Sequence, residues 1–312
     1  MIEADGVERR FGRQGAVVAL QGVTFRLDRA DILGILGGDQ SGKTSLVRIL
    51  AGLVLPTAGR ATVGGFDVRY ADRIREIVGY LPQAPSLHRN MTIAGYLDFW
   101  AMVDGQPRSQ RVERIAELLA FFDLTDQARE MILDTTTFTQ RRTFLALALL
   151  SNPPVLLLDD PMAALTSPER DAIVQKLGAL AEQGKTILIT ATRLADLQPV
   201  CSHILTLFEG RATRSYETSV LLRRVGAARH ARVFIESKAP ASRIVPAVRD
   251  LRGVGDVKES ERAIILFVEP GTFRIEDLQA ALEAAGIDAR GIREAGLTIG
   301  DIFRTLIQGE AS

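Results

Sequence analysis

Short apolar runs alternate with amphipathic stretches over the first two-thirds of the chain. The runs Val17–Leu27, Ile32–Leu36 and Val155–Leu158 predict β-strands, because they are short and rich in branched residues. The last of them is apolar on both faces, which is typical of a central strand in a parallel sheet. A helix is predicted directly after the second run. We expect this helix at Lys43–Leu53. Two further strands are expected at Ile187–Thr190 and His203–Phe208, joined by a helix at Leu194–Val200. This alternation predicts an α/β domain.

The pattern changes near residue 215, where we place a domain boundary that divides the chain into residues 1–214 and 215–312. Beyond the boundary the order is strand, helix, strand, strand, helix, strand. These elements are expected at Ala231–Glu236, Ala241–Leu251, Val254–Ser260, Ala263–Glu269, Ile275–Ala285 and Ile287–Arg293. The order predicts a small α+β domain of the ferredoxin-like kind. A final amphipathic segment, Thr298–Gln308, is suited to docking on its own domain or on a second copy.

Composition and charge narrow the classes of function. Lys plus Arg equals Asp plus Glu at 38 each, so no net field attracts nucleic acid or anionic lipid. The single cysteine, Cys201, excludes an internal disulfide and suits the cytosol, where we expect it as a packed, inert thiol. The most apolar stretch, Leu145–Leu158, is interrupted by Ser151–Pro154 and is shorter than the ~20 residues of a membrane-spanning helix. Residues 1–5 lack the features of a signal peptide. We therefore expect a soluble protein whose membrane role, if any, comes through a partner.

A phosphate-binding loop is the strongest chemical signal. Residues Gly37–Thr44 fit the pattern G-x-x-x-x-G-K-[ST] in full, after a predicted strand and before a predicted helix. Glycines let backbone N–H groups surround a phosphate, and the helix N-terminus adds positive potential. Lys43 is expected to reach the β- and γ-phosphates, and the Thr44 hydroxyl to ligate Mg²⁺. A glycine turn without a ligand is the weaker alternative. The predicted nucleotide-binding residues here are Gly37, Asp39, Gln40, Ser41, Gly42, Lys43, Thr44 and Ser45.

Two aspartates follow the buried strand Val155–Leu158. A carboxylate at the end of a strand beside a phosphate-binding loop holds Mg²⁺ through water, the role expected for Asp159. Asp160 is then placed to orient the attacking water. The alternative is that both aspartates cap the turn before Pro161. The phosphate-binding loop favours the metal-binding interpretation.

With these motifs, residues 1–215 resemble the ATP-binding subunits of ABC transporters. The stretch Ala19–Phe25 is similar to the family's opening strands. The resemblance implies that Phe11 stacks on adenine, although an ordinary packed phenylalanine is an equal alternative. Gly79–Gln83 resembles the family's glutamine loop, so Gln83 is expected near the metal and the attacking water. Residues 88–100 match the region that faces the membrane partner in this family.

Several positions depart from the family's pattern. The signature Leu-Ser-Gly-Gly-Gln, which contacts the γ-phosphate bound to the opposite subunit, falls on Thr135–Thr139. Thr136 still offers a hydroxyl there, but Phe138 puts a ring where a glycine belongs. Asp160 stands for the catalytic glutamate and Thr192 for the switch histidine, whose positive charge a threonine lacks. These departures predict that nucleotide binding is kept and that hydrolysis is slow or lost.

The resemblance implies a P-loop NTPase core of ABC type with a helical subdomain, followed by the ferredoxin-like domain. It implies ATP and Mg²⁺ as cofactors. The expected partners are a polytopic membrane subunit and a second nucleotide-binding subunit, the same or different, but no nucleic acid. The chain would lie in the cytoplasm on the inner face of the cell membrane, held by its partner. The terminal segment Leu297–Leu306 resembles subunits of ABC-2 exporters. The alternative is a regulatory or structural subunit that binds ATP without turnover.

Overall fold

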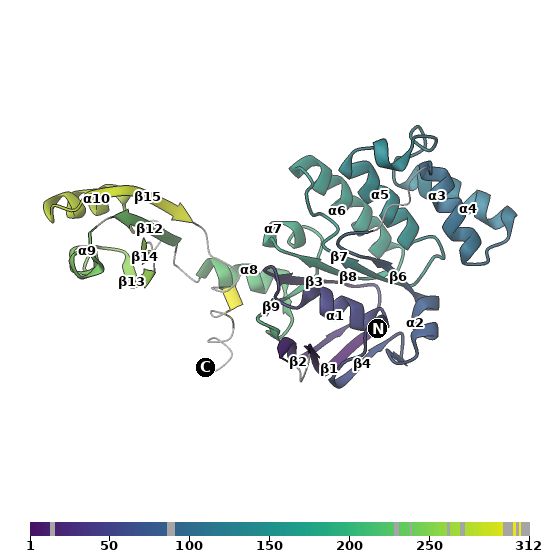
Figure 1. Ribbon diagram of the computed structural model, residues 1–312, viewed down its shortest axis with the longest axis horizontal. Helices are drawn as coiled ribbons and strands as arrows, with labels where there is room; N and C mark the ends of the chain where they lie inside the picture. Colours follow the sequence, from purple (N-terminus) through teal and green to yellow (C-terminus); the bar gives the residue numbers. More distant parts are fainter. Residues whose placement is uncertain are drawn as a thin grey trace. The chain divides into compact units, whose positions relative to one another are not determined.

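The chain forms two compact units in the computed structural model, Met1–Thr218 and Ser219–Ser312 (Figure 1). Each unit is described by itself. The structure describes residues 1–12, 16–85, 91–227, 231–237, 239–260, 263–268, 272–295, 302–303 and 306.

The first unit is built on a parallel sheet whose strands run in the order β9-β3-β8-β7-β6. Every residue of β3, β7 and β8 is buried, because helices and a second sheet cover the two faces. Two short antiparallel strands, β10 and β11, pair with β9. The bounds are β3 Ile32–Gly37, β6 Val78–Leu81, β7 Val155–Asp159, β8 Thr186–Ala191, β9 His203–Phe208, β10 Arg211–Ala212 and β11 Tyr216–Glu217. The predicted α/β class is confirmed.

An antiparallel sheet of order β2-β1-β4-β5 packs below the parallel one, with helix α1 (Lys43–Leu50) between them (Figure 1). Its strands are β1 Ile2–Phe11, β2 Val17–Leu27, β4 Ala58–Val63 and β5 Phe66–Asp67. Strand β1 is absent from the sequence-based prediction, since charged residues interrupt its apolar ones. The expected end of α1 at Leu53 is wrong, because Gly52 takes a left-handed conformation with φ 68° and closes the helix.

A helical part adjoins the edge strand β6, against which α5 packs. Threonines begin two of its helices: the side chain of Thr92 accepts from the Gly95 N–H, and that of Thr136 accepts from the Thr139 N–H. The helices of the first unit beyond α1 are α2 Ala71–Ile77, α3 Ile93–Val103, α4 Arg108–Phe121, α5 Thr137–Ala148, α6 Ser167–Glu182 and α7 Leu194–Leu197, with a 3₁₀ turn at Ile132–Asp134. Within the described ranges, no helix has the length and apolar character needed to cross a membrane.

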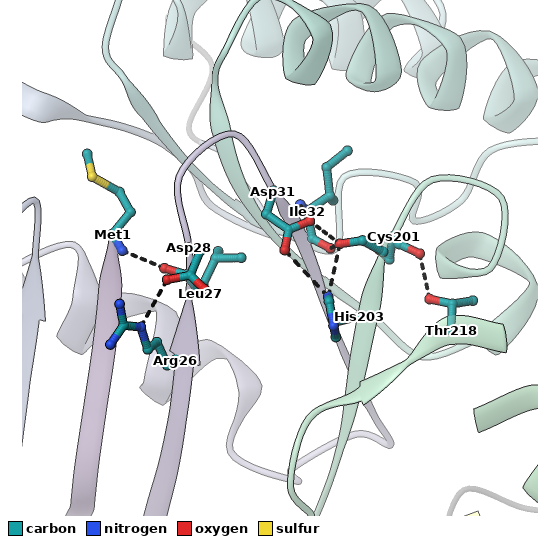
Figure 2. Close-up of polar contacts among 10 residues, drawn as sticks. Met1, Arg26, Leu27, Asp28, Asp31, Ile32, Cys201, His203 and Thr218 are labelled. Carbon is teal, nitrogen blue, oxygen red and sulfur yellow. Dashed lines mark hydrogen bonds and ion pairs between the residues drawn. The ribbon is translucent and has the colours of Figure 1, made fainter. Parts of the chain in front are cut away.

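Polar contacts fix the amino ends of the parallel strands, opposite the phosphate-binding loop (Figure 2). His203 Nδ1 lies 3.4 Å from a carboxylate oxygen of Asp31, and the Ser202 hydroxyl donates to the same carboxylate. The Thr218 hydroxyl donates to the Cys201 carbonyl at 2.5 Å. These contacts hold the start of β9, and the last residue of the first unit, against the sheet.

The second unit is an antiparallel sheet of order β13-β14-β12-β15 with helices α9 and α10 packed on it. The connections give the order strand, helix, strand, strand, helix, strand, which confirms the ferredoxin-like prediction. The last strand begins two residues later than expected, because Ile287 follows a left-handed Gly286 and is buried in the core. Most of the segment 298–308 lies outside the described residues. The bounds are α8 Thr218–Ala227, β12 Ala231–Ser237, α9 Ala241–Val248, β13 Val254–Ser260, β14 Ala263–Val268, α10 Ile275–Ala284 and β15 Ala289–Ala295.

Candidate functional site

The loop between β3 and α1 has a backbone that only particular residues allow. Gly42 has φ 108°, and a Cβ atom there would lie 2.4 Å from the Ala19 carbonyl oxygen. Gln40 is also left-handed, with φ 61°. By contrast, a Cβ at Gly38 would meet nothing within 4 Å. The tight packing of Gly42 on β2 fixes the loop at the start of α1, so its N–H groups occupy defined positions.

Lys43 is held inside this loop. Its side chain is 7% exposed, and Nζ donates to the carbonyls of Gly37 at 2.8 Å and Gly38 at 2.7 Å. Burial lowers the pKa of Lys43, whereas the carboxylates of Asp160 and Asp159 raise it. The result is an ammonium group, poorly solvated and satisfied by two neutral carbonyls, that an arriving phosphate would engage more strongly.

A cavity of about 570 Å³ opens over the loop. Most of the predicted binding residues line it, together with residues of β2 and of the turn after β9. The lining residues are Val17, Val18, Ala19, Gln21, Asp39, Gln40, Ser41, Gly42, Lys43, Thr44, Ser45, Gln83 and Glu209. Gly37 is not among them, and serves the loop by its packing: a Cβ there would lie 2.4 Å from Ser41 Oγ. The structure therefore brings residues 39–45 and Gln83 to one cavity.

Phe11 lies at the end of β1 and does not line this cavity. The Arg9 guanidinium lies over the Phe11 ring in a cation–π contact, with Cζ 4.4 Å from the ring centroid. Val17 and Val18 of β2, which are 60% and 38% exposed, line the cavity instead. Sequence reasoning assigned no role to these valines, because an exposed apolar pair within a strand has no distinctive pattern. The stacking of Phe11 on adenine stays a prediction.

Asp159 ends β7 and is held by Thr190 of the neighbouring strand β8. The Thr190 hydroxyl donates to Asp159 Oδ1 at 2.8 Å and accepts from the Asp160 N–H at 2.9 Å. The other carboxylate oxygen, Asp159 Oδ2, is buried without a hydrogen-bond partner in the described residues. A buried, unsatisfied carboxylate oxygen fits a role in holding a metal ion or its water. Thr190 was not predicted, since only the pairing of β7 with β8 reveals it.

Asp160 follows in a left-handed conformation with φ 50° and is 6% exposed. Burial raises its pKa, with Asp159 adding to the effect, while Lys43 and Arg141 oppose it. Arg141, from α5, is 8% exposed and donates to the Gln83 carbonyl at 3.4 Å. The structure thus places a buried arginine near both residues predicted to handle the attacking water. Sequence reasoning gave Arg141 no role.

Three of the positions that depart from the family's pattern, Thr136, Phe138 and Thr192, do not line the cavity. Thr136 caps α5, where it accepts from the Thr139 N–H at 3.2 Å. Two residues further on, at Phe138, the Arg142 guanidinium lies over the phenylalanine ring, with Cζ 4.4 Å from the ring centroid. Thr192 follows the end of β8. None of Thr136, Phe138 and Thr192 is among the described residues lining the cavity of this chain. The roles implied for them by the resemblance remain predictions.

A phosphate-binding loop between β3 and α1, with two aspartates at the end of β7, defines a P-loop nucleotide-binding protein. The profile of the ABC transporter family matches residues 20–163. Daunorubicin resistance ATP-binding protein DrrA3 of Streptomyces coeruleorubidus is 30% identical, over 97% of this chain and 94% of its own. Linearmycin resistance ATP-binding protein LnrL of Bacillus subtilis is 25% identical, over 84% and 83%. The chain belongs to the ATP-binding subunits of ABC transporters.

Solved structures share the fold of the first unit. The post-hydrolysis dimer of an ATP-binding cassette with ADP and Pi aligns with TM-score 0.64 and 23% identity, over 70% of this chain and 99% of its own. The cbiO1 protein of Clostridium perfringens, part of an ABC transporter complex, aligns with TM-score 0.65 and 21% identity, over 71% and 90%. These similarities confirm an ABC-type P-loop fold.

Proposed function

We propose that this subunit binds Mg-ATP in the cavity over the phosphate-binding loop, pairs with a second nucleotide-binding subunit and drives or gates a polytopic membrane partner. We further propose that its hydrolysis is slow. The observation that carries the proposal is a buried lysine in a fixed amide loop that lines one cavity, with the carboxylates of Asp159 and Asp160 close enough to raise the pKa of that lysine. The names of the relatives, which refer to resistance to daunorubicin and linearmycin, favour an ABC-2 exporter on the inner face of the cell membrane.

The geometry of Lys43, Thr44, Asp159 and Gln83 supports the proposed binding. Phosphate oxygens would replace the Gly37 and Gly38 carbonyls as partners of Lys43, and charged acceptors give stronger hydrogen bonds than neutral ones. The Thr44 hydroxyl and Asp159 Oδ2 are the groups that would hold Mg²⁺, whose chemistry is to neutralise charge on the β- and γ-phosphate oxygens. Gln83 lines the same cavity and would approach the metal and the attacking water.

Slow turnover follows from three positions. The carboxylate of Asp160 is one methylene shorter than glutamate and buried, so it is a poorly placed base. Thr192 lacks the charge that an imidazolium brings to the γ-phosphate. Phe138 would weaken the partner's site rather than this chain's own, since the signature faces the opposite subunit. Loss of one preorganised donor commonly costs a factor of ~10²–10³ in rate. A regulatory subunit that binds ATP without turnover is the second candidate, favoured by the half-exposed Phe138 ring at the signature position.

Calorimetric titration with Mg-ATP tests binding. The unchanged chain should bind, and Lys43→Ala should weaken binding more than tenfold, because a buried charge-assisted contact to phosphate is lost. Lys176→Ala is the matched control, since Lys176 lies on α6, pairs with Asp123 and is not among the residues that line the cavity. Absence of binding by the unchanged chain refutes the proposal.

Phosphate release then separates the two candidates. A low rate that Lys43→Ala abolishes supports a slow ATPase. A rate indistinguishable between the unchanged chain and Lys43→Ala supports the subunit without turnover. The combined changes Asp160→Glu, Thr192→His and Phe138→Gly should raise the rate. A triple variant no faster than the unchanged chain would show that these positions do not cause the deficit.

A further inference from the structure

The cavity over the phosphate-binding loop has a second wall that carries an acidic side chain. Residues 39–45 form the wall for the phosphates, and Val17, Val18, Gln21 and Glu209 belong to the other. Glu209 follows the last residue of β9 and is exposed. Neither the loop motif nor the acid pair after β7 explains why a glutamate lies here.

Glu209 is held in place by the backbone around it. The Gly210 N–H donates to the Ser41 carbonyl at 3.0 Å, which ties this turn directly to the phosphate-binding loop. The Gln21 backbone N–H donates to the Gly210 carbonyl at 2.8 Å, and its side-chain Nε2 donates to the Glu209 carbonyl at 2.8 Å. A Cβ at Gly210 would lie 2.9 Å from the Ala19 carbonyl oxygen, so the turn and β2 are closely packed. Glu209 itself is left-handed, with φ 48°.

A carboxylate beside a site for a polyanion repels the phosphates unless a donor on the ligand meets it. A nucleotide offers such donors on its ribose, as vicinal hydroxyls, and on its base. Because Gly210 is bonded to Ser41 of the phosphate-binding loop, Glu209 lies close to where the phosphates begin, and the ribose is the next part of the ligand. The apolar side chains of Val17 and Val18 provide a surface that suits the face of a base instead. Acidic side chains bind ribose hydroxyls in other nucleotide-binding folds.

We propose that Glu209 accepts hydrogen bonds from the ribose hydroxyls of the bound nucleotide and so selects ribonucleotides over deoxyribonucleotides. This inference rests on the proposed binding of Mg-ATP in the cavity and names the group that recognises the sugar. The selectivity has a simple origin: removal of a hydroxyl leaves the Glu209 carboxylate beside the nucleotide with its repulsion uncompensated.

Titrations of the full chain with Mg-ATP, Mg-2′-deoxy-ATP and Mg-3′-deoxy-ATP test the proposal. In the unchanged protein, at least one deoxy nucleotide should bind about tenfold more weakly than ATP, the range of one charge-assisted hydrogen bond at an exposed site. In Glu209→Ala that ratio should fall to about one, and Glu209→Gln, which keeps a carbonyl acceptor, should retain part of it. Glu217→Ala is the matched control, because Glu217 pairs with His203 at the far end of β9.

Each outcome separates this inference from the proposed function. Equal affinities for ATP and both deoxy nucleotides in the unchanged chain overturn the role of Glu209 and leave Mg-ATP binding intact. A deoxy selectivity that persists in Glu209→Ala shows that another residue contacts the ribose, and it overturns the proposal. The proposal is also overturned if Glu209→Ala changes the ratio of ATP to GTP affinity but leaves the sugar selectivity unaltered, because Glu209 would then contact the base. No binding of ATP by the unchanged chain removes the proposed function itself. Thermal melting of both Glu209 variants checks that the fold is kept.

Discussion

Gly42→Ala should destabilise the first unit strongly, whereas Gly38→Ala in the same loop should be tolerated. The Cβ of an alanine at position 42 would lie 2.4 Å from the Ala19 carbonyl oxygen and 2.8 Å from Leu20 Cδ2. The backbone there has φ 108°, a conformation that side-chain-bearing residues rarely adopt. At Gly38 the added Cβ meets nothing within 4 Å, and φ is not positive.

Two costs combine at position 42. Holding a residue other than glycine in an unfavourable region of φ and ψ costs about 1–3 kcal/mol. Overpacking against neighbours that do not move freely costs about 1–3 kcal/mol more. The Ala19 carbonyl belongs to a strand of the antiparallel sheet, so it yields little. The free energy of unfolding should therefore fall by roughly 2–6 kcal/mol for Gly42→Ala, against about 0.5 kcal/mol or less for Gly38→Ala.

Urea unfolding followed by tryptophan fluorescence measures the difference. Trp100 is the only tryptophan of the chain and lies in α3, so its signal reports the first unit alone. The midpoint should drop for Gly42→Ala with little change in slope. Equal midpoints for the two alanine variants would refute the close contact of the loop with β2. Nucleotide binding by Gly38→Ala would show that the loop itself tolerates a methyl group where there is space.

Two further predictions concern buried ionisable groups. Burial raises the pKa of the Cys201 thiol, so iodoacetamide at neutral pH should leave the folded chain unlabelled and label it in urea; labelling of the native chain at the rate of a free thiol would contradict the packing. Burial also raises the pKa of Asp160 in the nucleotide-free chain. The free energy of unfolding should therefore fall as the pH rises from the pKa of an unfolded aspartate, about 3.9, through the higher pKa of Asp160 in the folded chain. The urea midpoint of Asp160→Asn relative to the unchanged chain should accordingly be higher at pH 7.5 than at pH 4.5, and a pH-independent difference would show that the carboxyl group is not desolvated.

The strongest features were predictable because they lie within contiguous segments. The loop around Lys43 carries its own geometry in the spacing of glycines, lysine and threonine, and its position between a strand and a helix is a local property. The buried strand that ends in Asp159 is likewise visible as an apolar run followed by acids. The ferredoxin-like unit followed from the order of its periodic segments.

Prediction from the local hydrophobic pattern failed where charged residues or turns interrupt that pattern. In strand β1 exposed charged residues interrupt the apolar ones, so its place in the antiparallel sheet depends on pairing with β2 and β4. Helix α1 ends three residues before the expected Leu53, because the left-handed turn at Gly52 stops it while the apolar pattern continues.

The sequence by itself determined that this protein has a phosphate-binding loop, two aspartates at the end of a buried strand, one α/β unit and one α+β unit. Only the tertiary structure decided which distant residues meet near this loop. The register of β7 and β8 brings Thr190 to Asp159, and the packing of α5 brings Arg141 to the Gln83 backbone. The hydrogen bond from Gly210 to Ser41 brings Glu209 to the cavity. These three contacts join residues that are 31, 58 and 169 positions apart, and strand pairing and packing, which no local periodicity encodes, bring them together.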